Sequence, residues 1–175
     1  MPARIPIVRV KAGRERSLRQ RHPWLFSGAI ASVDGAPAAG DTVELRASDG
    51  DFLAFAAWSP ASQIRARVWS FEPATIDAAF IASRIRRAIG VRAGLLDDAH
   101  TGVRLVHGES DGLPGVVADR YTDVVVVQFA SAGAEHWREA IVDALAEATG
   151  ARAIVERSDA DVRALEGLAP RVGVV

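Results

Sequence analysis

The sequence predicts an α+β protein in which a small β barrel precedes a second module of mixed strands and helices. In the first 71 residues, short stretches of alternating apolar and polar residues are separated by Gly and Asp, which is typical of a small barrel. Beyond residue 73, the apolar spacing is first helical, then strand-like, then helical again. With 175 residues and 49% hydrophobic content, the chain can bury one core or two small ones.

The elements of the barrel follow from local patterns. Residues 5–10 alternate as a strand, and residues 14–21 have room for one or two helical turns before Pro23. Further strands are predicted over residues 29–33, 41–47, 52–58 and 64–71. In the last of these strands, the alternation places Arg65 and Arg67 on the outer face.

The second module is predicted to begin after Glu72-Pro73. Residues 76–96 have apolar side chains near helical spacing, and residues 135–149 form an amphipathic helix pattern that Gly150 closes. Strands are predicted over residues 103–107, 115–119, 124–129 and 151–156, and a last helix over residues 159–167. The final apolar run, residues 172–175, predicts an interrupted strand and a polypeptide that is the front part of a longer protein.

Positive charge is concentrated near the N-terminus. Residues 1–30 contain seven Lys and Arg side chains and one acid, whereas the whole chain has a formal charge of −1. This asymmetry predicts a polyanionic partner, either nucleic acid or an anionic membrane. All cations except one are Arg, which suits forked contacts with phosphate, although a GC-rich genome also favours Arg. The cations of interest are Lys11, Arg14, Arg16, Arg19 and Arg21.

The composition argues against several kinds of site. The chain has no Cys, which rules out disulfides, zinc ribbons and thiol nucleophiles within it. His22, His100 and His136 are too scattered to predict a metal site, and the H-x-E motif at His107 lacks the Cys pair of a zinc deaminase. Neither a membrane-spanning apolar run nor a signal peptide is present, so we expect a cytoplasmic protein with no membrane or metal partner.

The segment GESDGLPG, residues 108–115, is rich in glycine. A phosphate-binding loop needs such glycines between a strand and a helix, but this segment joins two predicted strands and lacks Gly-Lys-Ser/Thr. Asp-Gly and Leu-Pro-Gly are typical of turns, so we interpret the segment as a turn and not as a cofactor site. The nearby acids Asp97 and Asp98 are interpreted as part of a solvated loop.

Trp24 and Phe26 follow the cationic stretch directly. Aromatic side chains of this kind can stack on unpaired bases. Their position after His-Pro at the end of a predicted helix also suits a place in the core. We interpret Trp24 as a core anchor that fixes the cations in place, and the cations as the groups that contact phosphate.

Four segments together resemble a known family. These are HPWLFSGAI over residues 22–30, GESDGLPGVVADRY over residues 108–121, ERSD over residues 156–159, and EGL over residues 166–168. They resemble the N-terminal half of the class I SAM-dependent methyltransferases that modify cytosine C5 in large-subunit ribosomal RNA. The resemblance covers nearly the whole chain, with the segments in the same order.

The resemblance implies a PUA-like RNA-binding pseudo-barrel over residues 1–73 and a central α+β domain of EEHEE type over residues 74–175, truncated at its C-terminal end. In that family a Rossmann-like domain follows, with the SAM-binding loop and the catalytic Cys. This chain has neither, so we expect no catalytic residue, no cofactor site and no activity in the chain alone, with SAM bound elsewhere in the parent protein. The implied RNA-contacting residues are Lys11, Arg14, Arg16, Arg19, Arg21, Arg65 and Arg67.

The first hypothesis is therefore the RNA-binding N-terminal and central portion of a SAM-dependent 23S rRNA (cytosine-C5) methyltransferase, which positions rRNA for a catalytic domain. The alternative is a protein-interaction or homodimerisation module without RNA affinity, which uses the apolar strands at residues 124–129 or 172–175. An intact small enzyme with its own SAM site is the third hypothesis. Calorimetric titration with SAM separates it from the other two.

Overall fold

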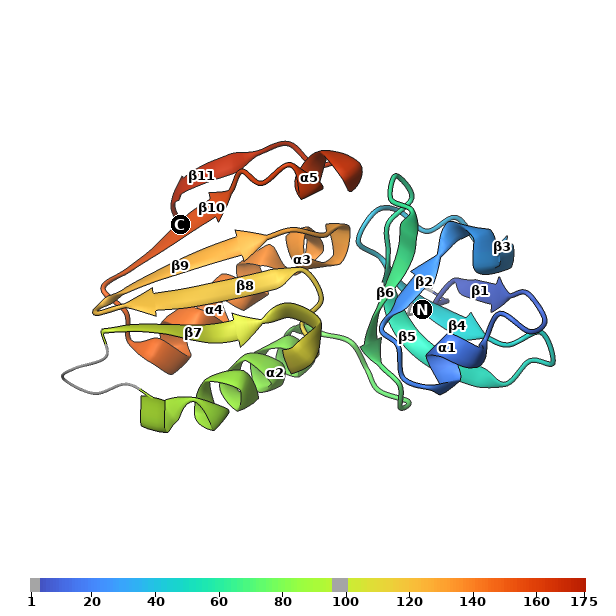
Figure 1. Ribbon diagram of the computed structural model, residues 1–175, viewed down its shortest axis with the longest axis horizontal. Coiled ribbons are helices and arrows are strands. Elements are labelled where there is room, and N and C mark those ends of the chain that lie inside the picture. Colours follow the sequence, from blue (N-terminus) through green and yellow to red (C-terminus); the bar gives the residue numbers. More distant parts are fainter. Residues whose placement is uncertain (1–3, 96–100) are drawn as a thin grey trace.

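The computed structural model describes residues 4–95 and 101–175. They form two β-sheets, one of six strands and one of five, which lie at opposite ends of the long axis (Figure 1). The predicted mixed α+β fold with a curled first sheet is confirmed. The end of the helix predicted to reach residue 96, the Asp97-Asp98 pair and His100 lie outside the described residues.

The six-stranded sheet curls around its own apolar core. Its strand order is β2-β6-β5-β4-β1-β3, and β1 pairs parallel with β4 and antiparallel with β3. Val8, Leu25 and Val43 are among the side chains buried inside it. The strands are β1 (Ile7–Val10), β2 (Trp24–Phe26), β3 (Ile30–Asp34), β4 (Thr42–Arg46), β5 (Phe52–Trp58) and β6 (Ile64–Ser70), with a 3-10 turn at Ser27–Ala29 after β2.

A single helical turn, α1 (Arg16–Arg19), connects β1 to β2. Its only apolar residue, Leu18, is 1% exposed and belongs to the barrel core, whereas its arginines face solvent. Because one buried side chain anchors the turn, the neighbouring cations are held on the barrel surface. Strand β2 was not predicted, since its three residues are too short to display an alternating pattern.

The five-stranded sheet has the order β11-β10-β9-β8-β7 and is covered on one face by the paired helices α2 and α4 (Figure 1). Ile85, Phe129 and Leu145 lie in the core between them. The strands are β7 (Gly102–His107), β8 (Val116–Tyr121), β9 (Val124–Phe129), β10 (Ala153–Ser158) and β11 (Arg171–Val174). The helices are α2 (Ala78–Val91), α3 (Ala132–His136), α4 (Arg138–Thr149) and α5 (Val162–Leu165), with 3-10 turns η2 (Ala93–Leu95) and η3 (Gly108–Asp111).

Two predicted helices differ from those observed. The helix predicted over residues 135–149 is divided at Trp137 into α3 and α4, and it begins earlier because the Ser131 hydroxyl caps the amide of Ala134. The helix predicted over residues 159–167 is the single turn α5. The last apolar run forms β11, which pairs antiparallel with β10.

The two domains share part of one core. Ala57 and Trp69 belong to barrel strands, yet both pack in the cluster beneath the second sheet. Gly133 of α3 makes this close approach possible, because a Cβ at that position would lie 2.3 Å from Ala57 Cβ. Strand β6 therefore has the barrel core on one face and the second domain on the other.

Candidate nucleic-acid interface

Five cations form a continuous stretch that we call the cationic strip: Lys11, Arg14, Arg16, Arg19 and Arg21. The strip runs from the end of β1 through α1, and each of its five residues is exposed. The structure thus places these predicted RNA-contacting residues on one connected surface segment. What they can bind depends on how many of them are already paired.

Two arginines of the strip are paired with acids of the barrel. Arg19 donates to Asp51 at 3.1 Å and lies 3.7 Å from Asp49. The Asp51 hydrogen bond, with the charges of the nearby acids, raises the pKa of Arg19 above its usual value. Arg21 lies 2.5 Å from Glu72. Exposed pairs of this kind contribute little to stability, so a phosphate can compete for either arginine.

Arg14 and Arg16 are uncommitted within residues 4–95 and 101–175: neither forms an ion pair there, and neither side chain has a hydrogen-bond partner. Lys11 donates only to the carbonyl oxygen of Gly28, at 2.9 Å. The net positive charge of the strip therefore comes from Lys11, Arg14 and Arg16. Such exposed cations are suited to phosphate, which they meet by charge and by forked hydrogen bonds.

Arg67 lies on the outer face of the barrel, as predicted, but that face is not exposed to solvent. Its side chain is only 8% exposed, and its Nη2 donates to Glu166 Oε1 at 2.8 Å. The alternation correctly directs Arg67 away from the barrel core, but the second domain covers that face of β6. Arg65 is partly buried and its guanidinium lies over the Trp58 ring, 5.8 Å from the centroid.

Arg67 is the centre of a buried polar cluster between the domains. Its Nη1 lies 3.6 Å from Glu109, and Glu109 also accepts a hydrogen bond from Trp24 Nε1 at 2.8 Å. Glu166 accepts from the amide of Ala132 as well, at 3.2 Å. Burial acts to raise the pKa of Glu166, but hydrogen bonding from Ser62 and the Arg67 guanidinium outweigh it, so that this pKa lies below its ordinary value.

Contrary to the prediction from the sequence, Trp24 is not buried in the core. It is half-buried at the boundary between the domains, with its indole N–H on Glu109 and Arg67 over its ring. The core anchor of the strip is Leu18 instead. Phe26 is 49% exposed and packs edge-on against Trp24.

The glycine-rich segment is a turn, as predicted. It follows β7 and returns the chain antiparallel into β8. Gly112 takes up the left-handed conformation, at φ 69°, and Leu113 beside it is fully buried. Gly115 abuts Ser131, whose hydroxyl would lie 2.3 Å from a Cβ added there. Glycine is needed at this close approach to the start of α3.

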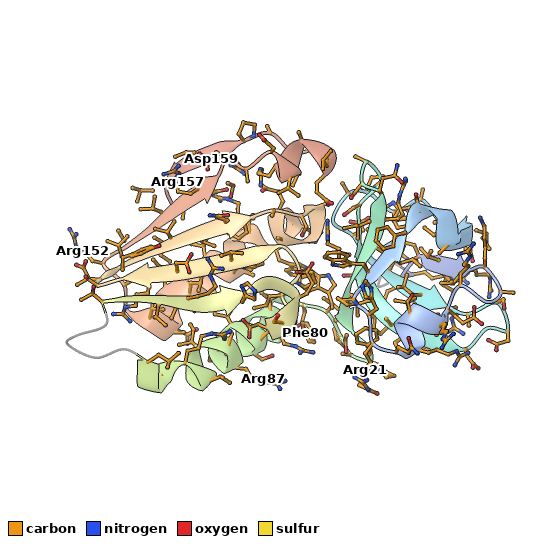
Figure 2. The ribbon with its side chains drawn as sticks, viewed as in Figure 1. Arg21, Phe80, Arg87, Arg152, Arg157 and Asp159 are labelled. Carbon is orange, nitrogen blue, oxygen red and sulfur yellow. The ribbon has the colours of Figure 1, made fainter. Side chains whose placement is uncertain are left out.

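A groove of about 620 Å³ lies between the barrel and α2. It has Arg21, Pro23 and Phe71 on the barrel side, Arg84, Arg87 and Val91 on α2, and the turn Glu109–Gly112 at its end. Figure 2 shows Arg21 and Arg87 on the same side of the molecule, one from each domain. Sequence reasoning missed Arg84 and Arg87, although their spacing of three residues indicates one face of a helix.

No group of three His, Asp or Glu side chains suited to a metal is found in the part of the chain that the structure describes. Across those same residues, none of the helices is both long and apolar enough to cross a bilayer.

Known proteins resemble this chain at the level of a domain, of the fold and of the sequence. A family model described as a PUA-like domain matches residues 8–71. Among solved structures, the crystal structure of a proposed methyltransferase complexed with SAH has the same fold over 89% of this chain and 40% of its own, with a TM-score of 0.76 and 19% identity. A proposed SAM-dependent methyltransferase from Streptococcus mutans gives a TM-score of 0.75.

Three curated relatives are ribosomal RNA large subunit methyltransferases I. The protein from Shewanella frigidimarina is 52% identical over 171 residues, which is 96% of this chain and 43% of the relative. The protein from Vibrio campbellii is 50% identical over 93% of this chain and 41% of its own length, and that from Vibrio cholerae is 47% identical over 97% and 43%. The chain thus spans about two fifths of the length of these relatives and is closely similar to that part of them.

Proposed function

We propose that this chain is the RNA-binding and central portion of a SAM-dependent methyltransferase that modifies cytosine C5 in 23S ribosomal RNA. In this proposal the barrel holds rRNA by phosphate contacts along the cationic strip, and a catalytic domain outside this chain binds SAM and performs the methyl transfer. The names of the curated relatives support methylation of large-subunit ribosomal RNA, whereas the cytosine C5 target follows from the resemblance of the sequence motifs. The match to a PUA-like domain supports RNA as the ligand of the barrel.

The observation on which the proposal rests is the pair of uncommitted cations at Arg14 and Arg16. Both are exposed; Arg16 lies in the turn α1 that Leu18 anchors, and Arg14 lies two residues before it. A guanidinium that is paired with an acid gains less from a phosphate, because the phosphate must displace that acid. An unpaired guanidinium gains the full interaction and releases counterions from the RNA. We therefore expect these two residues, with Lys11, to contribute more to RNA affinity than Arg19 and Arg21.

A salt titration of RNA binding tests this proposal. Replacing Arg14 and Arg16 with Ala should weaken binding of a labelled 23S rRNA fragment. The slope of log affinity against log salt should become shallower by about 0.7 to 0.9 for each phosphate that the variant no longer binds. The control is Arg152→Ala, which removes an exposed arginine, paired with Asp123, at the far end of the second domain (Figure 2). Equal behaviour of the two variants would contradict the role of the strip.

The reaction needs its own experiment in the full-length protein. We expect that protein to transfer the methyl group of labelled SAM to cytosine C5 of 23S rRNA. The Arg14→Ala/Arg16→Ala variant should raise KM for rRNA and leave SAM affinity unchanged, because the strip contacts only the RNA. Methylation at another atom or of another RNA would contradict the proposed reaction while leaving RNA binding intact.

One observation favours the alternative of a protein-interaction or homodimerisation module. Val172 and Val174 of β11 are 63% and 77% exposed, on an edge strand that can pair with another chain. Sedimentation velocity at several concentrations separates the two functions. Concentration-dependent self-association without RNA affinity would favour the interaction module.

A further inference from the structure

The groove between the domains contains positive charge that the protein does not neutralise. Each of its acids contacts an arginine: Glu72 contacts Arg21, and Asp111 contacts Arg92 at 3.0 Å. Glu109 contacts Arg67, which it shares with Glu166, so these arginines together with Arg84 and Arg87 exceed the four acids by one charge. The two remaining arginines of the groove have no ion-pair partner among residues 4–95 and 101–175. These are Arg84 and Arg87 of α2.

Helix α2 presents these arginines on a defined face. Ile81 and Ile85 are fully buried in the core, whereas the groove is lined by the stripe of Arg84, Arg87, Ala88 and Val91. Spacings of three and four residues place these side chains side by side along the helix. Arg84 and Arg87 therefore meet the groove together.

Arg84 is held in place before any ligand arrives. Its guanidinium lies over the Phe80 ring at 4.9 Å from the centroid, and its Nη1 lies 2.8 Å from the point where a Cβ on Gly112 would be. Burial and the neighbouring Arg87 lower its pKa from the usual value. An anion between the two guanidinium groups would relieve this repulsion, and a preorganised arginine loses little entropy on binding it.

Arg21 is the third arginine of the groove and also the last residue of the cationic strip. It has φ 62°, in the left-handed region that non-glycine residues rarely adopt. Its side chain lies over Phe71, 5.6 Å from the ring centroid, at the barrel wall of the groove. The strip and the groove are thus connected through one residue.

We propose that this groove binds the phosphodiester backbone of unpaired RNA nucleotides, with Arg84 and Arg87 on one side and Arg21 on the other. A volume of about 620 Å³ is suited to one or a few nucleotides. Phe71 and Val91 provide apolar surface against which a base can pack. The assignment of RNA, and not another polyanion, as the ligand rests on the proposed function. The surplus of positive charge in the groove is independent of that function.

The test compares neighbouring arginines of the same helix. Arg87 faces the groove, whereas Arg86 lies 3.9 Å from Glu147 of α4 and is 54% exposed. We expect Arg87→Glu and Arg84→Ala/Arg87→Ala to weaken binding of a labelled single-stranded RNA, by about fivefold near 0.1 M salt for each phosphate that is no longer bound. The salt slope should become shallower by about 0.7 for each such phosphate. Arg86→Glu and Arg86→Ala should leave both quantities unchanged.

The outcomes distinguish this inference from the proposed function. If Arg14→Ala/Arg16→Ala weakens RNA binding and the groove variants behave like the Arg86 variants, only the groove assignment is overturned. If groove variants alone lose affinity, the groove is supported and the strip is not. If the unmodified chain binds no RNA, both the strip and the groove assignments are overturned. If an acidic peptide binds with the same dependence on Arg87, the assignment of the groove to RNA is overturned. Arg87→Glu changes an exposed side chain, so it tests the groove even where the double variant does not fold.

Discussion

The cationic strip and the cluster around Arg67 use the same residue type for opposite purposes. Arg14 and Arg16 are exposed and uncommitted among the described residues, whereas Arg67 is 8% exposed and contacts Glu109 and Glu166. The difference lies in what surrounds each arginine, since a guanidinium remains charged in both places. An arginine is available for a ligand where it is exposed, and most available where the fold supplies no acid to neutralise it.

The largest effect is expected from breaking the buried cluster. Replacing Arg67 with Met leaves Glu166 buried and unpaired, and should cost about 3 to 5 kcal/mol of unfolding free energy. Chemical denaturation measures this cost. The double variant Arg67→Met/Glu166→Gln should be more stable than the single one, because no unpaired charge remains on Glu166. Equal stability of the two would show that the ion pair is not the source of the effect.

A smaller loss is expected where the domains touch through α3. In Gly133→Ala, the new methyl group would lie 2.3 Å from Ala57 and 3.0 Å from the Trp69 ring. The resulting overpacking should cost about 1 to 3 kcal/mol, measured by thermal unfolding. Gly90→Ala on α2 is the control, since no atom lies within 4 Å of the added Cβ and Ala favours a helix.

The pH dependence of stability distinguishes the buried cluster from the strip. Because the folded-state pKa of Glu166 is lowered, its contribution is present above the unfolded-state value of about 4.3 and is lost as the pH falls through the folded-state pKa. Unfolding free energy measured below about pH 4.3 should therefore fall less steeply in Glu166→Gln than in the unmodified protein. A parallel decline in both proteins would contradict the lowered pKa.

The smallest effect on stability is expected in the strip itself. Arg14→Ala/Arg16→Ala removes exposed side chains without partners among the described residues, so its unfolding free energy should change by no more than about 0.5 kcal/mol. Its RNA affinity should nevertheless fall. A large loss of stability in this variant would mean that the strip, like Arg67, is structural.

Strands and helices with a clear local pattern of apolar residues could be predicted from the sequence, because neighbouring residues alone determine that pattern. Strands 52–58 and 124–129 have the predicted bounds, because continuous apolar runs between turn residues leave little choice. The partners of β6 could not be predicted in this way. Alternation distinguishes two faces of a strand, but only the tertiary structure reveals that the second domain covers the face with Arg67.

The candidate site was predicted in part for the same reason. The strip is contiguous in the sequence, so its charge was visible there, although the roles of its residues in RNA binding stay predictions. The groove joins Arg21 to Arg84 and Arg87, which only the folded chain brings together. The helical spacing of Arg84 and Arg87 indicates a shared helix face. The contacts of the groove acids Glu109 and Asp111 with Arg67 and Arg92 join distant elements, so the sequence could not reveal them. The domain boundary at residue 73 also stays a prediction.

Trp69 has a consequence for how the molecule moves as a whole. It lies on a barrel strand but is buried in the core of the neighbouring domain, so neither domain can swing away without exposing a large aromatic ring to water. The two domains should therefore unfold in one cooperative transition. Two phosphates held at Arg14 and Arg87 would then be a fixed distance apart, and the protein would select RNA whose backbone matches that length.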